Sequence, residues 1–264
     1  MSKSSVLEKL RKPPIAEVVC GIYFDEITEL DPVAVGAYWG HRRDEFPKRQ
    51  LHPAVFAPAV PQQVSIGTGL PRLRTWLISR DDSYVIQIQH DRFYLNWRLR
   101  SEIYPRFSAQ GGLQERVIAE YTEFSQFCER EFQTAPTPAA IELGKIDHFV
   151  EGRDWIDKRD MTEMFPGLNA ILQVAKTESP NVLMHFKESR EGHPLQVSLT
   201  TATTGEGTEK KRILRLETTV IRHCGPSLID ARDSFAKANL DANEVFAALI
   251  PKDQRAMRFQ SKES

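Results

Sequence analysis

Cysteine is scarce in this sequence, and the three cysteines present are far apart. They are Cys20, Cys128 and Cys224, an odd number at wide spacing, which predicts neither a disulfide framework nor a Cys-x-x-Cys metal site. Cys20 falls in an apolar strand pattern and Cys128 on the apolar face of a helical pattern. We therefore expect both to be inert core thiols in a protein of the reducing cytoplasm.

An excess of one charge sign and long apolar runs are also missing. The 35 basic and 36 acidic residues give a formal net charge of −1. This balance gives no global attraction to nucleic acid or to an anionic membrane, although it leaves room for a local basic patch. Charges interrupt the first residues, and no run approaches the ~20 apolar residues of a membrane helix. We expect a cytoplasmic protein with no membrane partner.

Motifs of known catalytic or metal chemistry are absent. The glycines at 67–69 lead toward a strand, and the segment 204–210 lacks the spacing of a phosphate-binding loop. A zinc site would have to combine His148, His223 and Cys224. No local His-x-His or His-x-x-x-His spacing supports such a site. We therefore expect no cofactor, no metal and no catalytic residue that the sequence identifies.

Alternation and turn residues give the organisation of the first half, residues 1–133. Asp31 followed by Pro32 is a helix start, and short polar turns at 81–83 and 90–92 separate short apolar runs, as in an antiparallel meander. Apolar residues spaced by three and four predict a long helix after Gly112. The predicted elements are a strand at 15–24, a helix at 33–45, an irregular loop at 51–63, strands at 73–79, 84–89 and 93–98, and a helix at 113–132.

The second half, residues 134–264, follows a proline-containing connector at 134–138 and repeats the order of elements. Its predicted elements are a strand at 141–150, a helix at 160–174, strands at 182–188, 195–201 and 212–223, and a helix at 227–249. We therefore predict an α+β protein of two β-α-β-β-β-α halves with antiparallel meanders. The halves could join into one continuous curved sheet covered by two long helices.

The strongest candidate site is the block at 92–106. Arginine and asparagine side chains there could cluster to bind a carboxylate, a phosphate or a partner backbone. The competing interpretation places the aromatic side chains in the core and lets the arginines brace the meander against the long helix. The candidate binding residues are Arg92, Asn96, Trp97, Arg98, Tyr104 and Arg106.

Arginine and aromatic side chains interleave along the whole meander. A sheet face that presents both can stack the bases of single-stranded nucleic acid. The competing interpretation is a solvated outer face whose aromatic side chains pack inward. The residues concerned are Arg72, Arg74, Trp76, Arg80, Tyr84, Arg92, Phe93, Tyr94, Trp97, Arg98 and Arg100.

Three segments resemble a family of uncharacterised, sporadically distributed bacterial proteins. LRKPPIAEVV at 10–19 resembles the start of that family, and QIQHDRFYLNWR at 87–98, followed by YPR at 104–106, resembles its most specific block. LDANEVFAALI at 240–250 is similar to its C-terminal helix, although Pro251 stands where that helix would run on. The resemblance implies no settled activity; the sporadic distribution suggests mobile genes in stress or anti-phage loci.

These observations favour a non-enzymatic binding or assembly subunit of a bacterial cytoplasmic complex. It would dock a protein partner, or a second copy of itself, through the meander face or the two long helices. One alternative is a single-stranded nucleic-acid-binding module that uses the arginines and aromatic residues of the meander. Another is an enzyme with an unfamiliar site in the crevice between the halves.

Overall fold

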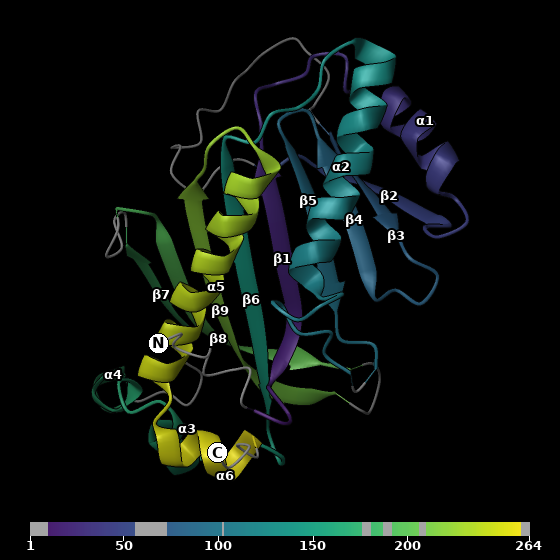
Figure 1. Ribbon diagram of the computed structural model, residues 1–264. Helices are drawn as coiled ribbons and strands as arrows, with labels where there is room; N and C mark the ends of the chain where they lie inside the picture. The colour runs from purple at the N-terminus through teal and green to yellow at the C-terminus, as the bar shows by residue number, and fades with distance from the viewer. Residues whose placement is uncertain are drawn as a thin grey trace.

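The computed structural model describes residues 10–55, 73–101, 103–175, 181–186, 192–205 and 210–259. Its nine strands form one antiparallel sheet in the order β2-β3-β4-β5-β1-β6-β9-β8-β7. Figure 1 shows two long helices, α2 and α5, side by side across one face of this sheet. The prediction of an α+β fold with one continuous sheet beneath two long helices is confirmed.

The strands are β1 (Ile15–Tyr23), β2 (Lys48–Pro53), β3 (Leu73–Ile78), β4 (Tyr84–Gln89), β5 (Arg92–Arg98), β6 (Ala140–Val150), β7 (Asn181–Phe186), β8 (Leu195–Thr204) and β9 (Lys211–His223). The helices are α1 (Pro32–Arg42), α2 (Leu113–Phe132), α3 (Lys158–Met164), α4 (Leu168–Ala175), α5 (Leu228–Leu249) and α6 (Lys252–Phe259). The division into domains 1–133 and 134–264 stays a prediction; strands β1 and β6, one from each part, pair at the centre of the sheet.

The helix starts follow local capping chemistry. The Asp31 side chain accepts hydrogen bonds from the backbone N–H groups of Val33 and Ala34 at 2.8 Å, as the sequence predicted for α1. Ser227 and Asp230 form a reciprocal capping box at the start of α5. Both caps satisfy N–H groups that the first helical turn leaves without an intrahelical partner.

Two predictions about proline-containing segments were wrong. Residues 51–53, predicted to belong to a loop, form the end of β2, which pairs with β3. Strand β2 is the edge of the sheet, and an edge strand tolerates Pro53 because only one of its sides carries ladder hydrogen bonds. The rest of the predicted loop, from residue 56, and the glycines at 67–69 lie outside the described residues.

The helix predicted at 160–174 is two helices, α3 and α4. Phe165 between them has φ −126° and ψ 78°, which is not helical. The ring of Pro166 clashes with a helical conformation at the residue before it, so the first helix ends there. At the other end of the chain, α6 follows Pro251 as a short helix that the sequence did not predict.

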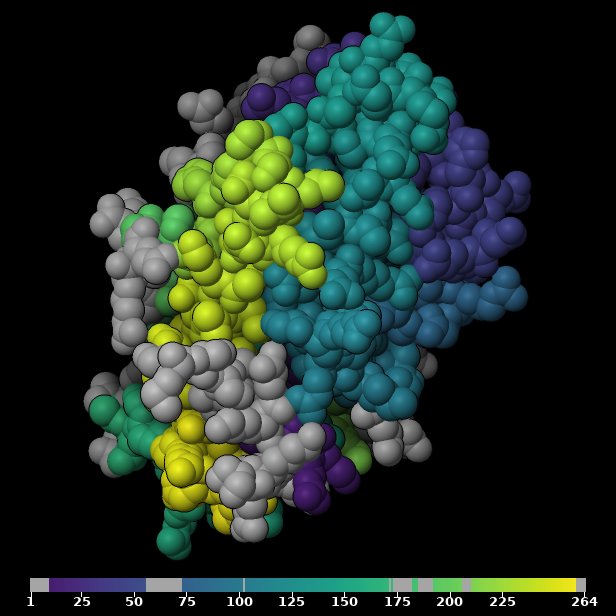
Figure 2. All heavy atoms as spheres, in the orientation of Figure 1, coloured from purple at the N-terminus to yellow at the C-terminus, as the bar shows by residue number. Residues whose placement is uncertain are grey.

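The core lies between the helices and one face of the sheet. Phe124 of α2 packs on Phe93 of β5 with ring centroids 5.2 Å apart. The ring of Tyr38 on α1 also packs on Phe124, with 5.8 Å between the centroids. Each such buried aromatic side chain contributes ~2–3 kcal/mol. Figure 2 shows the side chains of α2 and α5 in contact over the sheet. Cys20 and Cys128 are buried in this core, as predicted.

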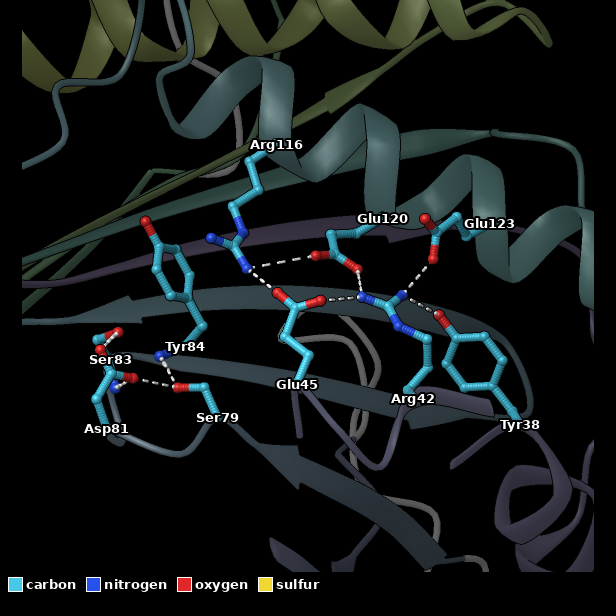
Figure 3. A network of polar contacts seen from close by, with 10 residues as sticks. All are labelled: Tyr38, Arg42, Glu45, Ser79, Asp81, Ser83, Tyr84, Arg116, Glu120 and Glu123. Atoms are coloured by element: carbon cyan, nitrogen blue, oxygen red, sulfur yellow. Dashed lines mark hydrogen bonds and ion pairs between the residues drawn. The ribbon is translucent and has the colours of Figure 1, made fainter. Parts of the chain in front are cut away.

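An ion-pair network fixes α1 against α2 (Figure 3). Arg42 of α1 contacts Glu120 of α2 at 2.8 Å and Glu123 at 2.6 Å, while Arg116 of α2 reaches back to Glu45 at 2.5 Å. Arg42 and Glu120 keep only 10% and 8% of their side-chain surface exposed, so this pair is much less screened by water than a surface pair. The guanidinium of Arg116 also lies 3.7 Å from the ring centre of Tyr84.

Candidate binding pocket on the outer face of the sheet

The sheet face opposite α2 and α5, called the outer face below, carries a polar pocket. Side chains alternate along a strand, so β5 sends Trp97 toward the helices and its neighbours Asn96 and Arg98 to the outer face. The Trp97 ring packs against Tyr104 at 5.2 Å between centroids. Arg106 lies in the turn before α2 with φ 41°. Of the six residues that the sequence singled out, Arg92, Asn96 and Arg98 therefore share the outer face.

The pocket has a volume of about 370 Å³. It lies over the five strands from β3 to β6 in the sheet order, so both parts of the chain contribute to it. Its described lining consists of Glu17, Val19, Tyr23, Val55, Arg74, Trp76, Gln87, Arg92, Tyr94, Asn96, Arg98 and Glu142.

Strand register places one cross-strand row through the middle of the pocket. Trp76, Gln87, Tyr94, Gly21 and Glu142 stand opposite one another on β3, β4, β5, β1 and β6. A Cβ atom at Gly21 would stand 2.5 Å from the ring of Tyr94. The missing side chain therefore lets the Tyr94 ring lie over the backbone of β1 at Gly21, with its hydroxyl directed toward β6.

A carboxyl group with two phenols forms the β6 side of the pocket. The hydroxyl groups of Tyr23 and Tyr94 both donate to Oε2 of Glu142, the second at 3.2 Å. Burial raises the pKa of Glu142, and the two donated hydrogen bonds offset part of that rise. The guanidinium of Arg92 lies 4.5 Å from the centre of the Tyr23 ring and forms an ion pair with Asp91 at 2.8 Å.

The remaining arginines pack on Trp76. The guanidinium of Arg98 lies 5.0 Å from the Trp76 ring centre and that of Arg74 lies 5.3 Å from it, while the His52 ring packs on Trp76 in a tilted arrangement with the ring centroids 4.0 Å apart. Arg98 also pairs with Glu17 at 3.5 Å. Burial lowers the pKa of Arg74. Three arginines thus face two glutamates, and the cation–π contacts already cover the ring of Trp76.

Four buried polar atoms in this pocket have no hydrogen-bond partner among the described residues. They are two donors, Nε of Arg74 and Nε1 of Trp76, and two acceptors, Oε1 of Gln87 and Oδ1 of Asn96. The side chains of Gln87 and Asn96 belong to residues only 4% and 3% exposed. Each buried group left without a hydrogen bond costs ~1–3 kcal/mol, so these four atoms call for partners beyond the described residues.

Sequence reasoning missed Gln87 and Glu142. A signal for Gln87 was present, because Gln87 and Gln89 alternate with Ile86 and Ile88 in a strand otherwise made for the core. Glu142 enters the pocket only through the pairing of β1 with β6, between residues more than a hundred positions apart in the chain. No local pattern specifies that pairing.

Comparisons with protein-family models, with curated proteins and with solved structures found no match. The resemblance to the sporadically distributed bacterial family therefore stays a prediction. Within the described ranges, no three His, Cys, Asp or Glu side chains group in a way that could hold a metal ion. No helix of the described residues combines the length and the apolar character needed to cross a membrane.

Proposed function

We propose that the protein is a binding subunit whose outer-face pocket recognises an extended segment of a protein partner. The observation that carries the proposal is the set of four unpartnered polar atoms on Arg74, Trp76, Gln87 and Asn96. A partner that supplies two acceptors and two donors would complete hydrogen bonds whose absence destabilises the free protein.

A peptide segment fits this requirement. Each of its residues other than proline brings one backbone N–H and one carbonyl group. This equal supply matches the pocket, where unpartnered donors and acceptors are equal in number. Tryptophan, tyrosine and arginine are also the residue types that dominate binding energy at protein interfaces. The charges of the lining nearly balance, which favours an uncharged backbone over a polyanion as the occupant.

Base stacking on the meander, the nucleic-acid alternative of the sequence analysis, receives less support. Phe93 and Trp97 are buried on the helix side, and Tyr84 is covered there by Arg116. The Trp76 ring is covered by His52 and two arginines. An aromatic platform for bases needs exposed ring faces, which these side chains do not offer.

A peptide library displayed on phage tests the proposal. We expect selection on the wild-type protein to return peptides whose binding is lost in Asn96→Leu, which removes the amide and keeps the size of the side chain. The control is Lys237→Ala, an exposed change on α5. Failure to select any peptide, or selected peptides that bind Asn96→Leu equally well, would contradict the proposal. Self-association of the wild-type protein that Asn96→Leu abolishes would identify a second copy as the partner.

The enzyme alternative has its own test. Native mass spectrometry of the purified protein would show a small molecule retained in the pocket between the two parts of the chain. A stoichiometric adduct that Asn96→Leu removes would favour a small ligand over a peptide. The cytoplasmic setting and the link to stress or anti-phage loci stay predictions.

A further inference from the structure

A second surface surrounds the segment where the chain enters β1, and it adjoins the outer-face pocket, with which it shares Glu17 and Arg98. Two hollows of about 650 Å³ and 570 Å³ meet there and share Pro13, Pro14, Leu99 and Arg153 in their lining. Because they share this lining, the two hollows adjoin and form one recessed surface around the end of the central strands. We call it the basic groove.

Positive charge is concentrated in the basic groove although the chain as a whole carries a net charge of −1. Its described lining includes only two carboxylates, those of Glu17 and Asp154. Such a local excess creates a positive potential that the net charge hides. The cationic residues of the lining are Arg11, Lys12, Arg98, Arg100, Arg106, Arg153, Arg215 and Arg258.

Part of this charge is held in place by carboxylates and part is not. Arg153 pairs with Asp154 at 2.7 Å, and Arg215 pairs with Glu217 at 2.6 Å. Arg258 donates to the backbone carbonyl of Asp154. Arg11 and Lys12, in contrast, are exposed, and no described carboxylate pairs with either side chain. The groove therefore combines fixed guanidinium groups with cations that are available to a ligand.

The other features of the groove suit a linear polyanion with apolar faces. Leu99 and Ile103 lie among the cations with 43% and 75% of their surface exposed. The cations are almost all arginine, whose planar fork matches phosphate oxygens in pairs. Arg11, Lys12, Arg106 and Arg258 line the first hollow only, and Arg98, Arg100 and Arg215 line the second only, whereas a site for one phosphate gathers its donors around a single point.

We propose that the basic groove binds the phosphate backbone of single-stranded nucleic acid. Arginine and lysine neutralise successive phosphates, and the apolar side chains of Leu99 and Ile103 give bases a surface to rest on. The inference concerns a different kind of ligand, and it rests on Arg11, Lys12 and Arg100, which do not line the outer-face pocket, although Glu17 and Arg98 line both. It also differs from base stacking on the meander, because the affinity comes from charge.

Fluorescence anisotropy with a labelled 20-nucleotide oligothymidylate tests the inference. The groove variant carries Arg11→Ala, Lys12→Ala and Arg100→Ala, three exposed residues. We expect at least tenfold weaker binding than for wild type at 50 mM salt. Neutralising about three phosphates gives a slope of about −2 for log affinity against log salt concentration, and the groove variant should flatten this slope.

The matched control carries Arg43→Ala, Arg130→Ala and Lys237→Ala, which remove the same charge from exposed sites outside the groove. We expect it to bind within twofold of wild type. No binding of wild type at 50 mM salt, or an equal loss in the control, would overturn the inference. So would a polyglutamate peptide that competes as well as the oligonucleotide, because the groove would then select acidic protein. Unchanged oligonucleotide binding by Gln87→Met, a change at a residue that lines the pocket and not the groove, is expected and separates the groove from the pocket.

Discussion

Asn96 and Glu17 form a hydrogen bond across β5 and β1, with Nδ2 of the amide donating to Oε1 of the carboxylate at 2.7 Å. An ionised carboxylate only accepts, so this bond fixes which end of the Asn96 amide faces Glu17. The other end, Oδ1, is then held in the outer-face pocket, where no described residue is its hydrogen-bond partner. A surface residue would rotate to find water; Asn96 is 3% exposed and is kept in place.

The close approach of Tyr94 to Gly21 predicts a sharp effect of a single methyl group. In Gly21→Ala the new Cβ would meet the Tyr94 ring at 2.5 Å, so the ring must leave its position above β1. We expect a loss of ~1–3 kcal/mol in the free energy of unfolding, measured in urea, and a changed near-ultraviolet circular dichroism spectrum.

The control for this change is Gly40→Ala in α1, where an added Cβ meets no atom within 4 Å. Alanine is the better helix former, so this variant should gain up to ~1 kcal/mol. A Gly21→Ala variant as stable as wild type, with an unchanged spectrum, would show that the Tyr94 ring is not held as described.

Removing the guanidinium from the α1–α2 network should destabilise the fold strongly. Arg42→Met leaves the carboxylate of Glu120 8% exposed and without its closest cation, which we expect to cost ~3 kcal/mol in urea denaturation at pH 7. The exposed ion pair of Arg159 with Glu163 provides the control, since Arg159→Met should leave the free energy of unfolding close to that of wild type.

The pH dependence of Arg42→Met follows from Glu120. Burial already raises the pKa of this carboxyl above its ordinary value, and loss of Arg42 raises it further. A raised pKa in the folded state means that the folded protein holds a proton which the unfolded chain releases, so stability falls as pH rises. The deficit of the variant should therefore shrink between pH 7 and pH 5. A deficit that grows on acidification would contradict this account.

The buried carboxyl group of Asp147, on the helix side of the sheet, should give the free energy of unfolding a second pH dependence. Burial raises its pKa from 3.8 to about 7, and the charge of Lys145 opposes that rise. Between these two pKa values the folded state binds a proton that the unfolded state does not, so this group makes stability fall as pH rises from 4 to 7. Asp147→Asn should flatten the curve of unfolding free energy against pH in this range and raise stability at pH 8.

Asp25→Asn serves as the control for Asp147→Asn, because Asp25 is exposed. Its curve of unfolding free energy against pH should follow that of wild type. If Asp147→Asn is less stable than wild type at pH 8, the buried carboxylate is a net stabilising partner of Lys145 and this prediction is wrong.

Local chemistry in the sequence was enough to predict much of the fold. Alternation located most strands, and Asp31 marked the start of α1. The missed elements depend on context: β2 could include Pro53 because it is an edge strand, and Pro166 broke a periodic pattern into α3 and α4. A hydrophobic pattern indicates neither that a strand lies at the edge of a sheet nor that a single proline ends a helix.

The same distinction between local pattern and long-range context applies to the candidate site. Arg92, Asn96 and Arg98 belong to one strand and alternate, so their common face could be expected from residue spacing. Glu142 comes from a strand in the other half of the chain, and Gly21 matters only because it stands opposite Tyr94. The pairing register of strands far apart in the chain sets the positions of Glu142 and Gly21. Their neighbours in the fold cannot be inferred from the residues adjacent to them in the sequence.

Gln87→Met is the most direct test of the claim that the pocket is built for a partner. The substitution keeps the length of the side chain and removes the buried acceptor Oε1, which has no partner in the part of the chain that the structure describes. Unfolding in urea and titration with a pocket-selected peptide would be measured on the same preparation. The account predicts that the free energy of unfolding stays the same or rises, with a gain of at most ~1–3 kcal/mol. It also predicts about tenfold weaker peptide binding. Lower stability with unchanged peptide affinity would contradict it.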